Sequence, residues 1–225
     1  LVGSEMCIRD RLLIANRGEI ASRIISSAHD MGISCVAIYT EADKDTPYVR
    51  EADQAFKLSD SYLNSKEILD IALKSNSDAI HPGYGFLSEN AAFANQVKKL
   101  NIKWVGPSSN AIKKMGDKLT AKEIAIKANV PTLPMTSDPK KANSIGYPIL
   151  VKAAAGGGGK GMRIVEKAKD LKESIKAAER EAEGGFGDKR VFLERYIKRS
   201  RHIEIQILGD SFGNIVHLGE RECSI

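Results

Sequence analysis

The feature that most constrains the fold of this chain is the glycine-rich run Gly156–Gly161. It stands between two segments rich in aliphatic and β-branched residues, Pro148–Ala155 and Met162–Lys167. Ordered glycines lose more backbone entropy than other residues, so a folded chain keeps such a run mainly where its backbone approaches another group closely. Flexible linkers are also rich in glycine, but they do not usually join two strand-like segments. The pattern predicts a β-hairpin flap that covers a phosphate, with Lys152 and Lys160 close to it.

Two familiar phosphate-binding motifs do not fit the run. In a P-loop alignment, Ala154 occupies the first glycine position and Gly161 replaces the Ser or Thr that binds magnesium. The dinucleotide fingerprint matches at Gly156, Gly158 and Gly161, but a strand-like segment follows where a helix must begin. The run therefore indicates a nucleotide without identifying the reaction.

The composition is ordinary for a globular protein. The 225 residues are 42% hydrophobic and 28% charged, with a net charge of +5. No apolar run approaches the roughly 18–20 residues of a membrane span, so we expect no membrane partner. The densest basic cluster, Lys198–His202, lacks the interleaved aromatic residues of nucleic-acid readers. We interpret it as a solvated strand edge and expect no nucleic-acid partner.

The three cysteines, Cys7, Cys35 and Cys223, follow no disulfide or zinc spacing motif. Their spacing predicts a reducing compartment and no zinc site. Both ends of the sequence are unusual. Residues 1–11 show neither a signal-peptide core nor a strand or helix period, and we interpret them as a non-native leader. The sequence stops at Ile225, directly after a well-patterned segment, and we interpret it as a truncated reading frame.

Residues 12–107 predict a Rossmann-like α/β domain with a parallel sheet. Leu12–Ala15 is typical of a buried strand, and an amphipathic helix closed by Gly32 precedes a second buried strand, Ile33–Thr40. Such βαβ units build parallel sheets with right-handed crossovers. The intervening loop, Asn16–Glu19, has one glycine and a carboxylate, so we expect the fold without dinucleotide binding.

The segment HPGYGFLSEN, residues 81–90, follows a further predicted strand of the parallel sheet. Ligands of α/β sheets bind at loops that follow the carboxyl ends of strands. Gly83 and Gly85 permit a tight backbone, and we expect Ser88 to cap the next helix. A purely structural turn is the alternative interpretation of this segment.

Residues 108–225 predict a second domain, with a lid subdomain at about 131–197. A helix over 118–128 and a proline-rich connector lead to the flap strands 149–155 and 162–165, and a helix follows. The alternation of polar and apolar residues on both sides of 210–214 predicts an antiparallel hairpin.

Taken together, the ordered motifs of the chain closely resemble those of biotin carboxylase, the ATP-grasp enzyme of biotin-dependent carboxylases. The likeness runs over residues 12–225 in the family's order and spacing, and HPGYGFLSEN is its most specific element. The other motifs are NRGEIA, MGDK, the strand that bears Lys152, GGGGKGM, LERYI, RHIEIQ and GERECS. The resemblance implies a Rossmann-like pre-ATP-grasp domain followed by an ATP-grasp domain that is truncated here and keeps its glycine-rich flap.

The resemblance also implies roles for individual residues. Lys152 and Lys118 match lysines that contact ATP phosphates, and Gly158 and Gly159 match glycines whose backbone approaches those phosphates. Tyr84 and Gly85 match the wall of the biotin and bicarbonate pocket. The positions that match the adenine-binding hinge and a nucleotide-contacting histidine are Glu194, Arg195, Tyr196, Ile197 and His202. Without the resemblance, His202 is a solvated strand histidine and Lys118 the first turn of a helix.

The implied reaction is ATP-dependent carboxylation of carrier-bound biotin by bicarbonate through carboxyphosphate. Its implied cofactors are ATP with Mg²⁺ or Mn²⁺. Its implied partners are a biotin carboxyl carrier protein or domain, a carboxyltransferase subunit and a second copy in a homodimer. The implied location is the cytoplasm, or the mitochondrial matrix in a eukaryote. The family's catalytic and metal-binding residues match positions beyond Ile225, so we expect none in this chain and no carboxylase activity from it alone.

Two alternatives remain open from the sequence. One is another ATP-grasp ligase of a carboxylate or of ammonia, which shares the flap and the lysines but not HPGYGFLSEN or GERECS. The other is a non-catalytic nucleotide-binding module.

Overall fold

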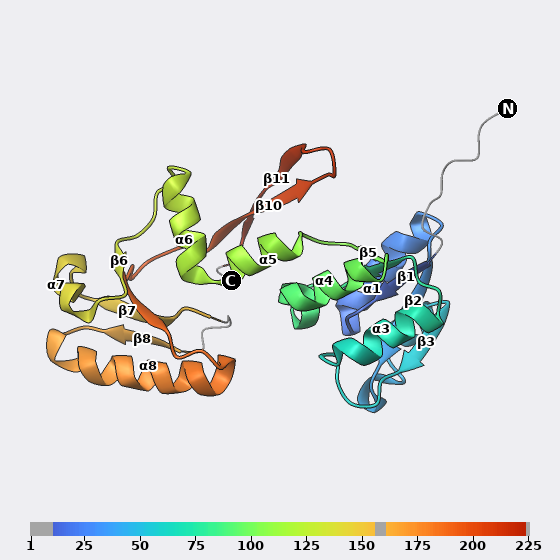
Figure 1. Ribbon diagram of the computed structural model, residues 1–225, viewed down its shortest axis with the longest axis horizontal. Helices are drawn as coiled ribbons and strands as arrows, with labels where there is room; N and C mark the ends of the chain where they lie inside the picture. The colour runs from blue at the N-terminus through green and yellow to red at the C-terminus, as the bar shows by residue number, and fades with distance from the viewer. Residues whose placement is uncertain (1–10, 156–160, 224–225) are drawn as a thin grey trace. The chain divides into compact units, whose positions relative to one another are not determined.

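The computed structural model describes residues 11–155 and 161–223, and the chain folds into two compact units that divide between Ala128 and Asn129 (Figure 1). The sequence predicted a domain boundary at 107/108, and that boundary stays a prediction. Among the described residues, no helix has both the length and the apolar character that a bilayer crossing requires.

The first unit is built on a five-stranded parallel sheet in the order β3-β2-β1-β4-β5. Its strands are β1 (Arg11–Ile14), β2 (Ser34–Tyr39), β3 (Gln54–Lys57), β4 (Ala79–His81) and β5 (Lys103–Trp104). Its helices are α1 (Gly18–Asp30), α2 (Pro47–Glu51), α3 (Ser65–Lys74), α4 (Ala91–Lys99), α5 (Ser109–Gly116) and α6 (Lys118–Lys127), with short 3-10 turns η1 (Glu41–Asp43) and η2 (Phe86–Glu89). The α/β class and the parallel sheet predicted from the sequence are confirmed.

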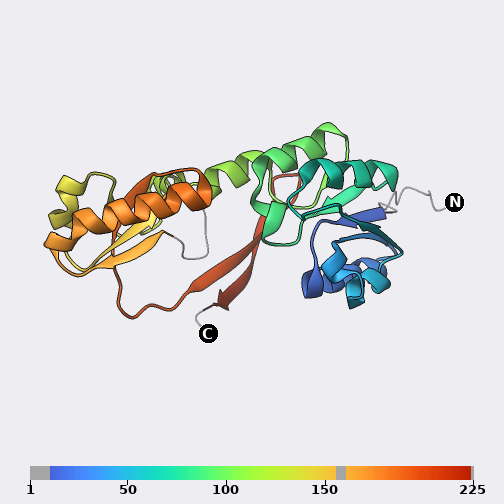
Figure 2. The same cartoon turned by 90° about the horizontal axis from the view of Figure 1, so that it is seen from below.

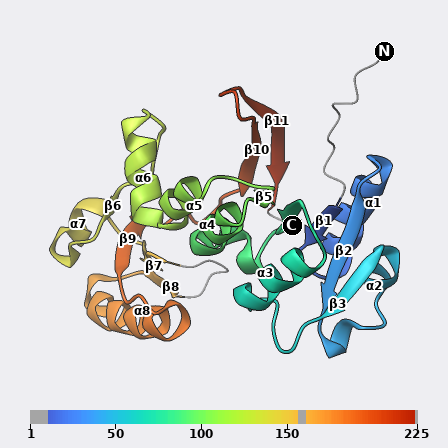
Figure 3. The ribbon, with the colours of Figure 1, turned by 45° about the vertical axis from the view of Figure 1, so that its right-hand side comes forward.

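Helices cover both faces of this sheet (Figure 3). Successive side chains of a strand point to opposite faces, so Leu13 and Val36 pack with α3 and α4 while Ile14 and Cys35 pack with α1 and α2. Strands buried on both sides read as continuous apolar runs, which is why β1 and β2 were recognisable in the sequence.

Asparagine rather than serine caps the helix after the HPGYGFLSEN segment. Ser88 lies inside η2, and the Asn90 side chain accepts a hydrogen bond from the Phe93 N–H at 3.0 Å. The expected Ser88 cap is therefore wrong by two positions, because the chain makes a 3-10 turn before α4 begins.

The second unit contains a four-stranded sheet in the order β6-β9-β7-β8, whose pairs are all antiparallel. Its strands are β6 (Met135–Thr136), β7 (Ile149–Ala153), β8 (Met162–Val165) and β9 (Val191–Arg195). Helix α8 (Leu171–Phe186) lies along one face of the sheet (Figure 2), and its Leu171 and Ala178 pack on Val151 and Leu193. Shorter elements are η3 (Pro139–Lys141), α7 (Ala142–Ile145) and η4 (Ala168–Asp170).

A second sheet in this unit is the hairpin of β10 (Ile203–Gly209) and β11 (Ile215–Glu222). The two strands pair antiparallel from Ile203 opposite Glu222 to Gly209 opposite Ile215, with an irregularity between Ile205 and Ile207. Asp210 closes the turn, since its carboxylate accepts hydrogen bonds from the N–H groups of Phe212 and Asn214. The predicted hairpin is confirmed.

Candidate functional site

The first candidate site lies where the strand order of the parallel sheet reverses, between β1 and β4. In such sheets the crossover helices leave to opposite faces on the two sides of this point and open a crevice, in which ligands bind. The loops that follow β1 and β4 meet here, and they contain Asn16 and the segment Pro82–Gly85.

Asn16 holds the two loops together. Its side chain is fully buried, and its Nδ2 donates hydrogen bonds to the carbonyls of Pro82 at 2.8 Å and Tyr84 at 2.9 Å. Its Oδ1 accepts from the N–H of Arg17 at 2.9 Å. A buried amide that satisfies several backbone groups fixes a loop firmly, because losing it leaves those groups unpaired.

The glycine at position 83 is required by this contact. Gly83 has a φ of +63°, and a Cβ there would lie 2.6 Å from Asn16 Nδ2. Its N–H donates to His81 Nδ1 at 3.0 Å, and burial lowers the pKa of His81, which favours the neutral ring. The loop is thus preformed by its own backbone and by Asn16.

Tyr84 and Gly85, predicted to line a biotin and bicarbonate pocket, lie at the tip of this loop. Tyr84 is 59% exposed, and its hydroxyl donates to Glu19 Oε1 at 2.6 Å. Gly85 has a φ of +69° and opens the 3-10 turn η2. The structure brings an acidic and a phenolic group together at the protein surface, on the loops that follow β1 and β4.

A partly buried ion pair, in which Asp43 is buried and Arg17 is about half exposed, also anchors the β1–α1 loop. The Arg17 guanidinium contacts Asp43, with Nε 2.7 Å from Oδ2, and the Tyr62 hydroxyl donates to the same carboxylate. Arg17, more than the Tyr62 hydroxyl, holds the pKa of Asp43 below its ordinary value. Tyr62 also contacts the buried Tyr48 hydroxyl at 2.9 Å. The network ties α1 to the segment after β2.

The second candidate site lies on the sheet of the second unit. Lys152 Nζ is 2.6 Å from Glu194 Oε2, and the two residues are diagonal neighbours on adjacent strands, since Lys152 pairs with Phe192 and Glu194 with Leu150. The Lys152 side chain is 24% exposed and that of Glu194 is 9% exposed. A partly buried carboxylate that accepts from an ammonium fixes the position of that ammonium.

The predicted hinge, Glu194–Ile197, begins inside β9 and continues beyond it. The Arg195 N–H donates a hydrogen bond to the Pro134 carbonyl, and the Tyr196 N–H donates one to the Pro148 carbonyl, both at 3.1 Å. The reciprocal bond from Pro134 to the Arg195 carbonyl cannot form, because proline has no N–H. Pro134 therefore supplies no hydrogen-bond donor to the Arg195 carbonyl.

The Arg195 side chain turns back into its own unit. Its Nη1 donates to the Ile145 carbonyl at 2.9 Å, and a Cβ at Gly146 would lie 2.5 Å from that nitrogen. The side chain thus braces α7, which leaves the backbone of Arg195 as the part suited to a ligand.

The glycine loop itself, with Gly158 and Gly159, lies outside the described residues. The segments on both sides of it are ordered as a hairpin. β7 pairs antiparallel with β8 from Ile149 opposite Val165 to Lys152 opposite Met162, and the Ala153 N–H donates to the Gly161 carbonyl at 3.1 Å. The predicted flap strands are confirmed.

Lys118 and His202 occupy the ends of elements. Lys118 is the first residue of α6, in the first unit, and the Asp117 side chain caps that helix by accepting from the Thr120 N–H at 2.8 Å. His202 directly precedes β10, in the second unit, and its carbonyl accepts from the Cys223 N–H at 2.8 Å. Their predicted contacts with ATP stay predictions.

Sequence reasoning missed Asn16, Glu19 and Pro134 as parts of these sites. The sequence predicts that NRGE is a loop poorly suited to a pyrophosphate, although an asparagine directly after a predicted buried strand is also a signal for side-chain bonding to backbone. Pro134 was counted only as part of a connector. Glu194 was assigned a backbone role, whereas the structure pairs its side chain with Lys152.

Two family models match the chain, and its relatives include biotin carboxylases and subunits of biotin-dependent carboxylases. The family described as "Biotin carboxylase, N-terminal domain" matches residues 8–112, and "Carbamoyl-phosphate synthase L chain, ATP binding domain" matches residues 117–225. The chain is 49% identical to Biotin carboxylase 1 of Bacillus subtilis over 96% of its own length and 51% of that protein. It is 48% identical to the mitochondrial methylcrotonoyl-CoA carboxylase subunit alpha of Dictyostelium discoideum over 96% of its own length and 33% of that protein.

Solved structures of the same family are similar throughout. The biotin carboxylase domain dimer of 2-oxoglutarate carboxylase from Hydrogenobacter thermophilus, in complex with MgADP, ADP and bicarbonate, matches with a TM-score of 0.93 and 44% identity. A beta-gamma-ATP complex of a biotin carboxylase from Campylobacter jejuni matches with a TM-score of 0.92 and 46% identity. The chain covers 51% of each of these two structures, and they cover 96% of it. The chain therefore belongs to the biotin carboxylase family of ATP-grasp proteins and corresponds to the N-terminal part of its longer members.

Proposed function

We propose that this protein contributes to the ATP-dependent carboxylation of carrier-bound biotin by bicarbonate, through carboxyphosphate, in a biotin-dependent carboxylase. Its partners in this proposal are a biotin carboxyl carrier protein or domain, a carboxyltransferase subunit and a second copy of the chain. The proposed compartment is the cytoplasm, or the mitochondrial matrix in a eukaryote. The family match and the complexes of its relatives with ADP, magnesium and bicarbonate support the proposal.

One observation on this chain supports the nucleotide role most directly, namely the Lys152–Glu194 pair next to the Arg195 carbonyl. An ammonium that a carboxylate already holds in place loses little further side-chain entropy when it binds a phosphate. Its positive charge also offsets the negative charge that develops as phosphoryl groups separate. The Arg195 carbonyl, opposite Pro134, suits the exocyclic amino group of adenine as an acceptor. In this proposal the hinge residues bind the base through backbone groups, and Lys152 contacts the phosphates.

Magnesium or manganese would accompany ATP and neutralise its phosphate charge. In the described ranges, the one group of three or more potential ligand side chains consists of His29, Cys35 and Asp53, in the first unit. This mixed group does not suit magnesium, which prefers oxygen ligands. We therefore assign no ligand for ATP-bound magnesium in this chain.

The nucleotide role is tested by titrating the 225-residue chain with ATP and measuring the heat of binding. We expect Lys152→Gln to weaken ATP binding about tenfold or more, because a charge-assisted contact with phosphate is lost. Lys176→Gln, which changes an exposed lysine of α8, is the matched control and leaves the affinity unchanged. Equal affinities of the two variants would contradict the assignment of Lys152.

The reaction is tested with a chimera in which this chain replaces the matching 51% of the Bacillus subtilis relative. We expect ATP hydrolysis that depends on bicarbonate and on a biotinylated carrier. A folded chimera whose ATP hydrolysis depends on neither bicarbonate nor the biotinylated carrier would favour another ATP-grasp ligase. A folded chimera that binds ATP without hydrolysing it would favour a non-catalytic nucleotide-binding module. Folding is checked by circular dichroism before any rate is interpreted.

The match of residues 117–225 to the carbamoyl-phosphate synthase ATP-binding family fits an ATP-grasp ligase in general. The match of residues 8–112 is specific to biotin carboxylase and favours the carboxylation of biotin.

A further inference from the structure

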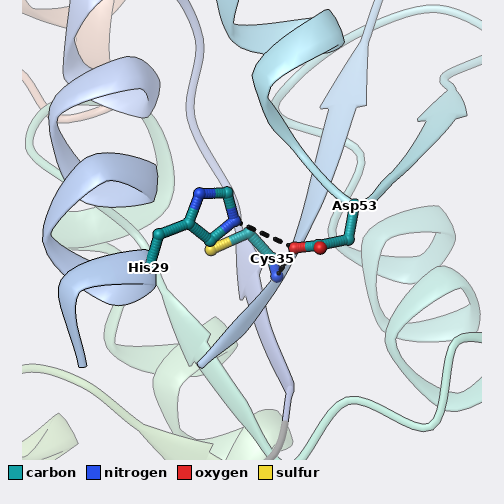
Figure 4. A group of neighbouring side chains, drawn as sticks. All are labelled: His29, Cys35 and Asp53. Atoms are coloured by element: carbon teal, nitrogen blue, oxygen red, sulfur yellow. Dashed lines mark hydrogen bonds and ion pairs between the residues drawn. The ribbon is translucent and has the colours of Figure 1, made fainter. Parts of the chain in front are cut away.

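Three side chains with metal-binding atoms converge in the first unit, away from the loops of the switch point (Figure 4). His29 comes from the last turn of α1, Cys35 from β2, and Asp53 from the residue before β3. One ligand atom from each lies within 4.8 Å of the other two. Within residues 11–155 and 161–223, no other set of three such groups comes together.

The carboxylate of Asp53 is already fixed in place. Its Oδ2 accepts the backbone N–H of Cys35 at 2.7 Å and lies 3.0 Å from His29 Nε2. The backbone bond fixes the carboxylate beside the strand that also carries the thiol. A bond between imidazole and carboxylate joins two groups that ligate metals, and a cation can replace the proton between them.

The three ligand atoms lie close enough for one tetrahedral cation to draw them together, since all are within 4.8 Å of one another. Zinc binds nitrogen and oxygen ligands at about 2.0–2.2 Å and sulfur at about 2.3 Å, so its ligand atoms lie roughly 3.3–3.7 Å apart. The pair His29–Asp53, at 3.0 Å, is already near this range. The side chains of His29 and Asp53 are 41% and 49% exposed, so both have room to adjust and water has access.

The charges balance as well. An Asp53 carboxylate and a Cys35 thiolate together neutralise a divalent cation, and His29 ligates as the neutral ring. A bound cation displaces the thiol proton of Cys35, as it does at other thiolate sites.

We propose that His29, Cys35 and Asp53 bind a divalent cation of the zinc class, with water as the fourth ligand. A nitrogen, sulfur and oxygen set favours zinc over magnesium or calcium, which prefer oxygen alone. The bound cation ties the end of α1 to the starts of β2 and β3. This site is independent of the nucleotide and biotin chemistry proposed above.

The experiment uses Co²⁺ as a spectroscopic probe on the 225-residue chain in which Cys7 and Cys223 are replaced by serine. We expect a sulfur-to-cobalt charge-transfer absorption that saturates at one equivalent and disappears when Zn²⁺ is added. Cys35→Ser abolishes the band. His29→Gln lowers the affinity for Co²⁺ at least about tenfold, because even outer-sphere changes at metal sites cost that much. Asp30→Asn, which changes an exposed neighbour of His29 on α1, leaves the charge-transfer band and the affinity for Co²⁺ unchanged.

Absence of the charge-transfer band at stoichiometric Co²⁺ in the folded chain would overturn the proposal. An affinity that His29→Gln leaves unchanged would also overturn it, because the band would then come from the thiol alone. His29 is well exposed, so this variant keeps the test decisive even if Cys35→Ser, which changes a buried side chain, fails to fold.

Discussion

In the first unit the candidate site is a loop fixed by a fully buried amide, whereas in the second unit it is an ion pair on a sheet. Asn16 satisfies two carbonyls of the β4–α4 loop and leaves that loop little freedom. Lys152 is held by one carboxylate, and its ammonium has three N–H donors, so it can contact a phosphate as well. The first site is thus held by buried backbone contacts, and the second by a partly exposed charge pair.

Removing the amide of Asn16 is the strongest way to test the rigid side of this contrast. We expect Asn16→Ala to lower the unfolding free energy of the first unit by about 3 kcal/mol, because it leaves buried backbone groups without partners. Urea denaturation followed by circular dichroism measures the change. Asn95→Ala, an exposed change on α4, is the control and should shift stability by less than about 0.5 kcal/mol. Similar losses in both variants would show that Asn16 is no special anchor.

Acid should weaken the first unit through Asp43. The pKa of Asp43 is lowered in the folded state, chiefly by Arg17. Its contribution to the free energy of unfolding is therefore fully present above the unfolded pKa of about 3.9, and it is lost as pH falls through the lower folded pKa. We expect Asp43→Asn to cost about 2 kcal/mol at pH 7 and progressively less below about pH 4. Denaturation from pH 7 to pH 2.5 measures the difference between the two chains. A difference that stays constant with pH would contradict the charge-based account.

Breaking the Lys152–Glu194 ion pair of the second unit should cost less stability than the changes to Asn16 and Asp43. We expect Glu194→Gln to destabilise this unit by about 1–2 kcal/mol, because Lys152 loses its carboxylate but remains partly solvated. A double-mutant cycle with Lys152→Gln isolates the interaction between the two side chains. A coupling free energy near zero would mean that Glu194 does not hold the ammonium in place.

The smallest expected effect concerns the Arg195 carbonyl in the predicted hinge. Pro134→Ala restores an N–H opposite the Arg195 carbonyl and allows the missing strand bond to form. We expect ATP affinity to fall about fivefold while stability changes by less than about 1 kcal/mol, since the new bond and the added unfolded-state freedom oppose each other. Calorimetric titration with ATP gives the affinity. Pro139→Ala, at the start of η3, is the control proline and should leave binding intact.

Much of the fold was predictable because its signals are local. The apolar runs of β1 and β2, the flap strands around the glycine run and the hairpin of β10 and β11 follow from the spacing of apolar residues. Strand β3 and helix α2 were not predicted. β3 is mostly exposed at the edge of its sheet, and α2 spans only Pro47–Glu51, so neither shows a strong period.

The site was predictable where one residue carries the signal. Lys152 stands on a strand beside glycines, and Tyr84 and Gly85 stand in a loop after a strand. The partners of these residues were not predictable, because Glu19 and Asn16 lie more than sixty positions away from Tyr84 in the sequence. Nothing near Tyr84 in the sequence indicates which acceptor its hydroxyl will reach.

The sequence alone determined the α/β class, the flap and the likeness to biotin carboxylase, because periodicity and motif spacing are properties of neighbouring residues. Only the tertiary structure decided which distant side chains meet. The strand order β3-β2-β1-β4-β5 joins Asn16 to the loop after β4 and gathers His29, Cys35 and Asp53. The antiparallel register of β7 and β9 likewise sets Lys152 beside Glu194. Strand order and register arise from packing the whole core, and a short segment does not encode them.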